Sequence, residues 1–280
     1  MEVFILIRSS FIFGIILMFS VSQGLENFVA KPYFEDHEIL NDLEFGRFLD
    51  SKVQLSSCQM LSTKLNDEPK MIASHRNLIG EGSHRRLVTS ITLEFEPSVH
   101  SFAVVVIERL PSGVFADPFE LQRLVLRGVL KDAAVFGDTN LELPSFRSNR
   151  SLVEVHVGIS PELHSGVHFQ KEVKIELPLH ARYQPLGHGF SVVEFGKPDV
   201  LLRYRVEENL LNRSCLVVPT NQSVQSEDGR IDWEVPCGNK EHTQIVAVVT
   251  FASAVLSAFL IILTSVSYSN FAIASDLKQS

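Results

Sequence analysis

The stretch Ile245–Tyr268, IVAVVTFASAVLSAFLIILTSVSY, carries no charged side chain over its 24 positions. A helix of this length extends about 36 Å at about 1.5 Å per residue, and a bilayer core requires about 20 apolar residues. A buried core helix of a soluble protein is the alternative, but a core helix this long usually carries a polar face. The stretch therefore predicts a transmembrane helix over residues 245–268, followed by a short tail, residues 269–280.

The amino terminus decides on which side of the membrane the larger part lies. Residues 1–24 contain Arg8, an apolar run over Phe11–Val21 and the small residues Ser22-Gln23-Gly24, which is the pattern of a cleaved signal peptide. An uncleaved anchor is the alternative. Cleavage predicts that residues 25–244 are lumenal and that the tail is cytosolic, although Lys240 and Lys278 give only a weak positive-inside bias.

Possible glycan acceptors agree with a lumenal location. Three Asn-X-Ser sequons precede the apolar stretch and none follows it, at Asn149, Asn212 and Asn221. A glycan on any of them would mark that asparagine as a surface position.

Composition narrows the function classes. The chain has 280 residues and a formal net charge of −8, which argues against nucleic acid as a partner because phosphate binding needs a basic surface. Its three cysteines do not make a disulfide scaffold. Cys215 and Cys237 are the predicted pair, because they flank a polar loop, and Cys58–Cys215 is the rival pairing; sequence alone does not choose between them.

Short strands dominate the central part. Residues 152–159, LVEVHVGI, alternate Val153, Val155 and Val157 with Glu154 and His156, as a half-buried strand does. Further strands are predicted at 86–95, 101–108, 172–179, 190–195, 200–206 and 215–218, and residues 101–108 suit a strand buried on both faces. We predict loop with one short helix for 25–54, loop for 66–83 and a helix for 121–135. The pattern favours a mainly β fold: an antiparallel β-sandwich-like domain with a short helix.

Catalytic motifs are missing from the sequence. It contains no GxGxxG between a strand and a helix, no P-loop, no GxSxG, no HExxH and no CxxC. We therefore predict no catalytic, cofactor-binding or metal-binding residue. The histidines at 156, 164, 168, 180 and 188 are interpreted as exposed loop and strand residues.

Two stretches combine rigid turns with aromatic and polar side chains: LPSGVFADPFEL at 110–121 and LPLHARYQPLG at 177–187. Together with LELPSF at 141–146, they resemble the PIG-X family, class X of phosphatidylinositol-glycan biosynthesis. The resemblance covers roughly residues 84–268 and includes the order of signal peptide, lumenal domain and carboxy-terminal anchor. The residues that carry the motif are Pro111, Gly113, Asp117, Pro118, Pro178, His180, Arg182 and Tyr183.

The resemblance implies a non-catalytic subunit of GPI mannosyltransferase I in the endoplasmic reticulum. Members of the family stabilise the catalytic subunit PIG-M, which transfers the first mannose from dolichol-phosphate-mannose. The resemblance carries over no ligand residue. A cell-surface adhesion or receptor ectodomain shares the same layout and is the alternative, and a lumenal enzyme is a third hypothesis.

The apolar stretch also carries a face of small residues. Thr250, Ala254 and Ala258 recur every four positions, and small residues let a second helix approach closely in a membrane. We expect this face to dock onto the catalytic subunit; the alternative is a plain anchor.

Overall fold

The computed structural model describes residues 28–56, 70–95, 102–159, 169–208, 211–221 and 230–279. The predicted signal peptide, residues 1–24, lies outside them, as do His164 and His168. The chain divides into two compact units. The first unit contains the large sheets and comprises the chain up to Pro185 together with Ser191–Pro236. The second unit comprises Leu186–Phe190 and the residues from Cys237 onward.

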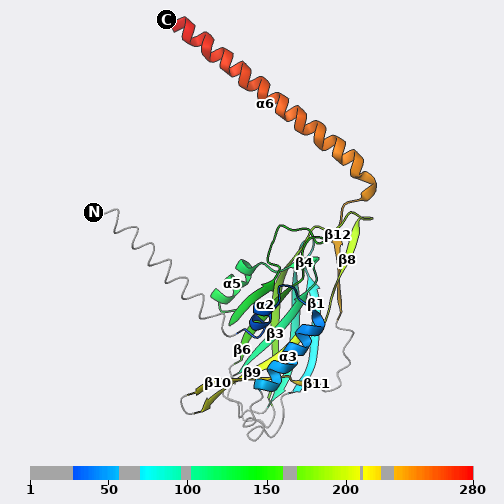
Figure 1. The fold of residues 1–280 in the computed structure, drawn as a ribbon, viewed down its shortest axis with the longest axis vertical. Coiled ribbons are helices and arrows are strands. Elements are labelled where there is room, and N and C mark those ends of the chain that lie inside the picture. Colours follow the sequence, from blue (N-terminus) through cyan, green and yellow to red (C-terminus); the bar gives the residue numbers. More distant parts are fainter. Residues whose placement is uncertain are drawn as a thin grey trace, which may run out of the picture. The chain divides into compact units, whose positions relative to one another are not determined.

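The first unit is built on two five-stranded sheets (Figure 1). One has the order β11-β1-β2-β7-β4, with β11 Thr220–Asn221, β1 Lys70–Ile79, β2 His84–Phe95, β7 Phe169–Ala181 and β4 Val114–Phe115. The other has the order β10-β9-β3-β6-β5, with β10 Leu211–Val217, β9 Asp199–Glu208, β3 Phe102–Leu110, β6 Ser151–Ile159 and β5 Asp132–Gly137. A small sheet pairs β8 Phe190–Phe195 with β12 Ile231–Pro236.

Neighbouring strands of both large sheets are antiparallel, except β1 with β11. The sheets share one apolar core, to which alternate residues of facing strands contribute, such as Ile91 of β2, Val104 of β3 and Ile175 of β7. Trp233 of β12 is fully buried in the same core. The predicted mainly β, antiparallel fold is confirmed, and all seven predicted strands are present within a few residues of their predicted ends.

A buried ion pair crosses this core. The Arg76 side chain of β1 donates two hydrogen bonds to the Glu108 carboxylate of β3, at 2.9 and 2.8 Å, and the two side chains are 5% and 6% exposed. Arg76 Nη1 also donates to the carbonyl oxygen of Gly196, at 2.6 Å. The ion pair between Arg76 and Glu108 therefore links the two large sheets through their shared core.

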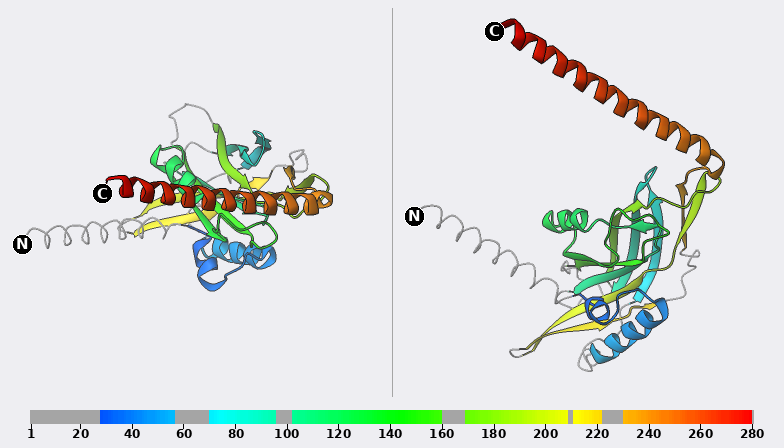
Figure 2. Two further views of the ribbon diagram at one scale, coloured as in Figure 1. Left: turned by 90° about the horizontal axis from the view of Figure 1, so that it is seen from above. Right: turned by 45° about the horizontal axis from the view of Figure 1, so that its top comes forward.

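Two helices cover the second face of the β3-containing sheet (Figure 2). They are α2, Lys31–Asp36, and α3, Asp42–Ser56. Their side chains Tyr33, Phe45 and Leu49 form a second apolar cluster with Val105 and Ile107 of β3. This explains why β3 is buried on both faces, as predicted. The prediction of loop with one short helix for 25–54 was incomplete: α2 is short, but the 15-residue α3 was not expected, because its apolar spacing is weak and its burial depends on the sheet.

Glu154 anchors the start of this helical layer. Its side chain is fully buried and accepts hydrogen bonds from the backbone N–H groups of Val29 and Ala30, both at 2.8 Å. His156 Nε2 lies 2.6 Å from the same carboxylate. The polar face of β6 thus faces a protein layer and not solvent, and the interpretation of His156 as exposed was wrong.

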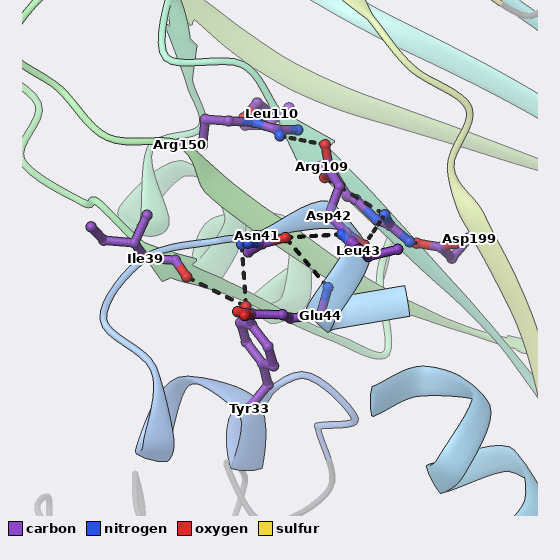
Figure 3. A network of polar contacts seen from close by, with 10 residues as sticks. All are labelled: Tyr33, Ile39, Asn41, Asp42, Leu43, Glu44, Arg109, Leu110, Arg150 and Asp199. Carbon is purple, nitrogen blue, oxygen red and sulfur yellow. Dashed lines mark hydrogen bonds and ion pairs between the residues drawn. The ribbon is translucent and has the colours of Figure 1, made fainter. Parts of the chain in front are cut away.

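Charged side chains fasten the start of α3 to the sheet (Figure 3). Arg150 donates to Asp42 Oδ2 at 2.6 Å, and Arg109 donates to Asp199 Oδ2 at 2.6 and 2.9 Å while lying 3.6 Å from Asp42 Oδ1. Asn41 caps α3 by accepting from the N–H of Leu43 at 3.0 Å. Burial acts to raise the pKa of Asp42, but Arg150 and Arg109 outweigh it and hold that pKa below its ordinary value.

Two other sequence predictions are corrected. Residues 66–83, predicted as loop, contain β1, whose register shifts between Met71 and Ala73 and so breaks the alternation. Residues 121–135, predicted as one helix, contain the end of α5, Pro118–Leu126, and the start of β5. Gly128 has a φ of +72°, a left-handed conformation that commonly ends a helix, and the chain then turns back into the sheet.

The predicted Cys215–Cys237 disulfide is wrong, because Cys237 is a free thiol while Cys215 is disulfide-bonded. The rival pairing involves Cys58, which lies outside the described residues.

The second unit is dominated by α6, Thr243–Gln279, preceded by a short 3₁₀ turn, η1, at Lys240–His242. The segment from Lys240 to Tyr268 is long and apolar enough to cross a membrane, and its side chains are exposed. The hydroxyl groups of Ser253 and Ser257 donate to carbonyl oxygens of the preceding turn, at 2.9 and 2.8 Å. These two hydroxyl groups are therefore satisfied within the helix, as a lipid environment requires.

Candidate functional site

The three motif stretches meet at one corner of the first unit, which we call the motif corner and define as residues 111–119, 141–146 and 177–185. Phe115 of β4 lies opposite His180 of β7 in the sheet. The N–H of Ser145 donates to the carbonyl oxygen of Tyr183 at 3.0 Å, which ties the middle stretch to the end of β7. Stretches that are up to 66 residues apart in sequence (Pro111 to Leu177) thus form one surface.

The first motif stretch makes a tight turn and starts a helix. Gly113 leaves no room for a side chain, since a Cβ there would lie 2.7 Å from Cγ2 of Val193. Asp117 caps α5 by accepting from the N–H of Phe119 at 2.9 Å, and Pro118 occupies the first helical turn. This is the arrangement that Asp at the N-cap and Pro at the next position favour. The carbonyl oxygen of Pro111 accepts a hydrogen bond from the N–H of Val114 at 3.2 Å, and this bond closes the turn.

The third stretch supplies two buried polar side chains. The Arg182 guanidinium donates to the carbonyl oxygens of Asn140 and Leu143, at 2.5 and 3.0 Å, and lies 4.9 Å from the centre of the Phe115 ring. Gln184 donates to the carbonyl oxygens of Gly113 and Arg182, at 3.1 and 3.0 Å. Burial lowers the pKa of Arg182, which the charge of Asp138 partly opposes. Arg182 and Gln184 therefore hold backbone segments together.

The outer surface of the motif corner carries exposed aromatic side chains and adjoins a hollow. Phe146 and Tyr183 are 62% and 61% exposed. Phe146, Gln184 and Val192 are among the residues that line an adjoining pocket of about 380 Å³. An exposed aromatic side chain at a hollow, with a second exposed aromatic side chain in the same corner, is typical of a surface that another molecule covers.

The remaining predicted residues have varied positions. Pro178 is buried in β7, opposite Arg86 of β2. His180 is half-buried and lies beside His84 and Glu120, a group of potential metal ligands. His188 is exposed, as predicted. Sequence reasoning missed His84, Glu120 and Gln184, because only the strand register and the position of α5 bring them to the corner.

The other predicted sites lie elsewhere. Asn149 is exposed, and its N–H donates to Asp138 Oδ2 at 2.8 Å. Asn212 and Asn221 belong to β10 and β11. Thr250, Ala254 and Ala258 are exposed on α6. Within the described residues, Asp117 and Arg182 bind backbone groups and His180 pairs with Glu120, and these contacts hold a shaped surface in place.

Comparison with known proteins gives the chain's relationships. The profile of the PIG-X / PBN1 family matches residues 80–266, which include the motif corner and most of the apolar part of α6. The chain is 26% identical over 221 residues to a rat protein described as "GPI alpha-1,4-mannosyltransferase I, stabilizing subunit", an alignment that covers 72% of this chain and 84% of the rat protein. Human and mouse proteins of the same description are 24% and 25% identical, with 72% of this chain and 83% and 84% of theirs covered. With a match over most of its length, the chain belongs to the PIG-X / PBN1 family.

Proposed function

We propose that this chain is a non-catalytic subunit that stabilises the catalytic subunit of GPI mannosyltransferase I. The family match from residue 80 to 266 carries the proposal, because it includes both the motif corner and the membrane-length helix. The catalytic partner in this proposal is PIG-M, which adds the first mannose to the GPI precursor from dolichol-phosphate-mannose.

The motif corner supports a role without chemistry of its own on the mannosyl donor. Asp117 caps a helix, Arg182 binds two carbonyl oxygens and Gln184 binds two more. Polar groups engaged in this way are stable supports, whereas a general acid or base must reach a reacting atom. The corner therefore suits recognition of a partner surface.

We place the protein in the membrane of the endoplasmic reticulum, with residues 25–244 in the lumen, α6 as the anchor and residues 269–280 in the cytosol. A disulfide at Cys215 fits an oxidising compartment. The exposed position of Asn149 suits a glycan acceptor, and we propose glycans at Asn212 and Asn221 as well. In this arrangement residues 1–24 act as the signal peptide.

Deletion of the gene tests the proposal. Cells without the chain should lose GPI-anchored proteins from their surface, and the full chain should restore them. Its glycans should remain sensitive to endoglycosidase H, because the protein stays in the endoplasmic reticulum. A receptor or adhesion ectodomain would leave GPI-anchored proteins in place and would acquire resistant glycans, and this result would refute the proposal.

The exposed face of the motif corner is the proposed lumenal contact. The double variant Phe146→Ala/Tyr183→Ala should lower the amount of catalytic subunit that co-purifies by about 10-fold or more, since aromatic anchors dominate most interfaces. Leu55→Ala is the matched control, because Leu55 is exposed on α3 outside the corner. Equal recovery of the catalytic subunit with both variants would contradict the role of the corner.

The small face of α6 is the proposed membrane contact. The hydroxyl groups of Ser253 and Ser257 are bonded within the helix, so close packing along Thr250, Ala254 and Ala258 remains as the means of association. Ala254→Leu/Ala258→Leu should lower co-purification, since two leucines hold the partner helix away. The control is Val255→Leu, on a different face of α6. Undiminished recovery of the catalytic subunit with the double variant would leave α6 as a plain anchor.

A further inference from the structure

Three potential metal ligands converge beside the motif corner, and none of them was singled out as a ligand by the sequence. They are His84 at the start of β2, Glu120 in the first turn of α5 and His180 near the end of β7. One ligand atom from each lies within 4.8 Å of the other two. The side chains are 53%, 30% and 30% exposed, so a solvent ion has access to them.

Strand register builds the group. His84 lies opposite His180 between β2 and β7, and Phe115 lies opposite His180 between β4 and β7. Directly opposed residues share one face of a sheet, and β7 lies between β2 and β4. The His180 ring is accordingly stacked between the other two rings, with centroids 4.3 Å from His84 and 5.1 Å from Phe115.

The stacking brings the Nε2 edges of the two imidazoles to the same side. Their planes differ by 6°, and the Nε2 atoms of both lie near the same carboxylate. Glu120 Oε2 is 3.0 Å from His180 Nε2, and Glu120 Oε1 is 3.6 Å from His84 Nε2. The Asp117 cap and Pro118 fix the first turn of α5, and this turn holds Glu120 beside the Nε2 atoms of the two rings.

The ligand atoms are close enough for one small cation once the exposed His84 ring turns out of its stack with His180, because a nitrogen lone pair lies in the plane of its ring and parallel rings do not point at one ion. Zinc binds histidine nitrogen and carboxylate oxygen at about 2.0–2.2 Å in tetrahedral geometry, which places neighbouring ligand atoms about 3.3–3.6 Å apart. The two distances to Glu120 bracket this range. Two imidazoles and one carboxylate favour zinc over magnesium or calcium, which prefer oxygen ligands throughout.

We propose that His84, Glu120 and His180 bind one Zn²⁺ ion or a similar divalent transition-metal ion. Three protein ligands leave the fourth position open to water or to a side chain of a bound partner. The ion joins β2, α5 and β7, and it therefore fixes α5 against the edge of the motif corner. The site is independent of the proposed function, because the isolated chain binds the ion.

Metal titration of the full-length chain tests the site. The protein is purified in detergent without a polyhistidine tag, stripped with a chelator and titrated with ZnCl₂ in a calorimeter. We expect one Zn²⁺ per chain and a higher melting temperature when it is bound. Co²⁺ in its place should give the intense visible absorption of a four-coordinate ion and not the weak bands of a six-coordinate one.

Variants identify the ligands. His84→Ala and Glu120→Gln should each weaken Zn²⁺ binding by at least about 10–100-fold, the loss that follows even from removing a group behind a ligand. Glu120→Gln keeps the shape of the side chain, so it remains informative if His84→Ala folds poorly. His75→Ala and Glu142→Gln, which alter exposed residues outside the group, should bind as the unaltered chain does. The proposal is overturned if the stripped chain binds no stoichiometric Zn²⁺, or if His84→Ala and Glu120→Gln bind it as tightly as the controls.

Discussion

Arg76→Leu is expected to lower the free energy of unfolding of the sandwich by about 3–5 kcal/mol at pH 8, because it leaves the Glu108 carboxylate buried without its partner. The two side chains belong to opposite sheets and are almost fully buried. Replacing both together, as Arg76→Leu/Glu108→Leu, should recover most of the loss, since an apolar pair of similar volume is often as stable as a buried ion pair.

The loss should depend on pH. Burial raises the pKa of Glu108 to about 7, although the charge and hydrogen bonds of Arg76 act in the opposite direction. Because this pKa is raised above 4.5, the folded chain binds the proton more tightly than the unfolded chain does. The contribution of Glu108 to stability is therefore largest at low pH and falls as the pH rises through about 7. Without Arg76, the buried carboxylate of Glu108 loses its favourable charge partner, whereas the protonated form loses less. Arg76→Leu should therefore lower the stability less at pH 5, where Glu108 is protonated in the folded chain, than at pH 8.

Trp233 provides the measurement. It is the chain's single tryptophan and is fully buried in the core, so its fluorescence during urea unfolding reports on the sandwich. Arg86→Leu is the matched control, because it breaks an exposed ion pair with Glu176 between β2 and β7 and should change stability by at most about 1 kcal/mol. A similar small loss for Arg76→Leu at pH 8, or a double variant no more stable than the single one, would contradict this account.

Glu154→Ala should detach the helical layer from the sheet. It removes the acceptor of two buried backbone N–H groups, those of Val29 and Ala30, and each buried donor left unpaired costs about 1–3 kcal/mol. The truncation also leaves a cavity. We expect a loss of several kcal/mol and faster hydrogen–deuterium exchange over Val29–Asp36. Glu154→Gln keeps one acceptor oxygen and the shape of the side chain. Its stability and its exchange rate should therefore lie between those of the unaltered chain and those of Glu154→Ala.

The exchange experiment has a clear control in Glu172→Ala, which alters an exposed residue of β7. Exchange over Val29–Asp36 in Glu154→Ala that matches the control would show that apolar packing of Tyr33 and Phe45 holds the layer without the carboxylate.

The sequence predicted the sandwich strands well, because their signal is local. Alternation in β2, β6 and β7 reflects burial of one face in the shared core. The same reasoning failed for Glu154 and His156, whose face is covered by a layer that precedes it by more than one hundred residues. It also failed for β1, where a register shift breaks the period. Helix α3 was missed because its burial comes from β3 and β10 and not from its own periodicity.

The residues of the candidate site likewise divide into those with a local sequence signal and those that depend on distant partners. The motif residues Asp117 and Pro118 act within their own turn, so the sequence shows their roles directly, whereas Gly113 is required by the close approach of Val193. Arg182 and the group of His84, Glu120 and His180 depend on partners between 36 and 96 residues away (His84 to Glu120 and His84 to His180). The cysteine pairing was likewise a choice among distant residues. Such sets are fixed by register and packing, which one sequence does not display.

We propose that this membrane-tethered, non-catalytic chain keeps its catalytic partner intact. The most direct measurement is transfer of the first mannose in microsomes from cells that lack the chain, with the amount of catalytic subunit determined in the same samples. We predict that transfer and amount fall together, that the rate per catalytic subunit is unchanged, and that the full chain restores both while a chain without residues 245–268 does not. Normal transfer with a normal amount of the catalytic subunit in these microsomes would contradict the account.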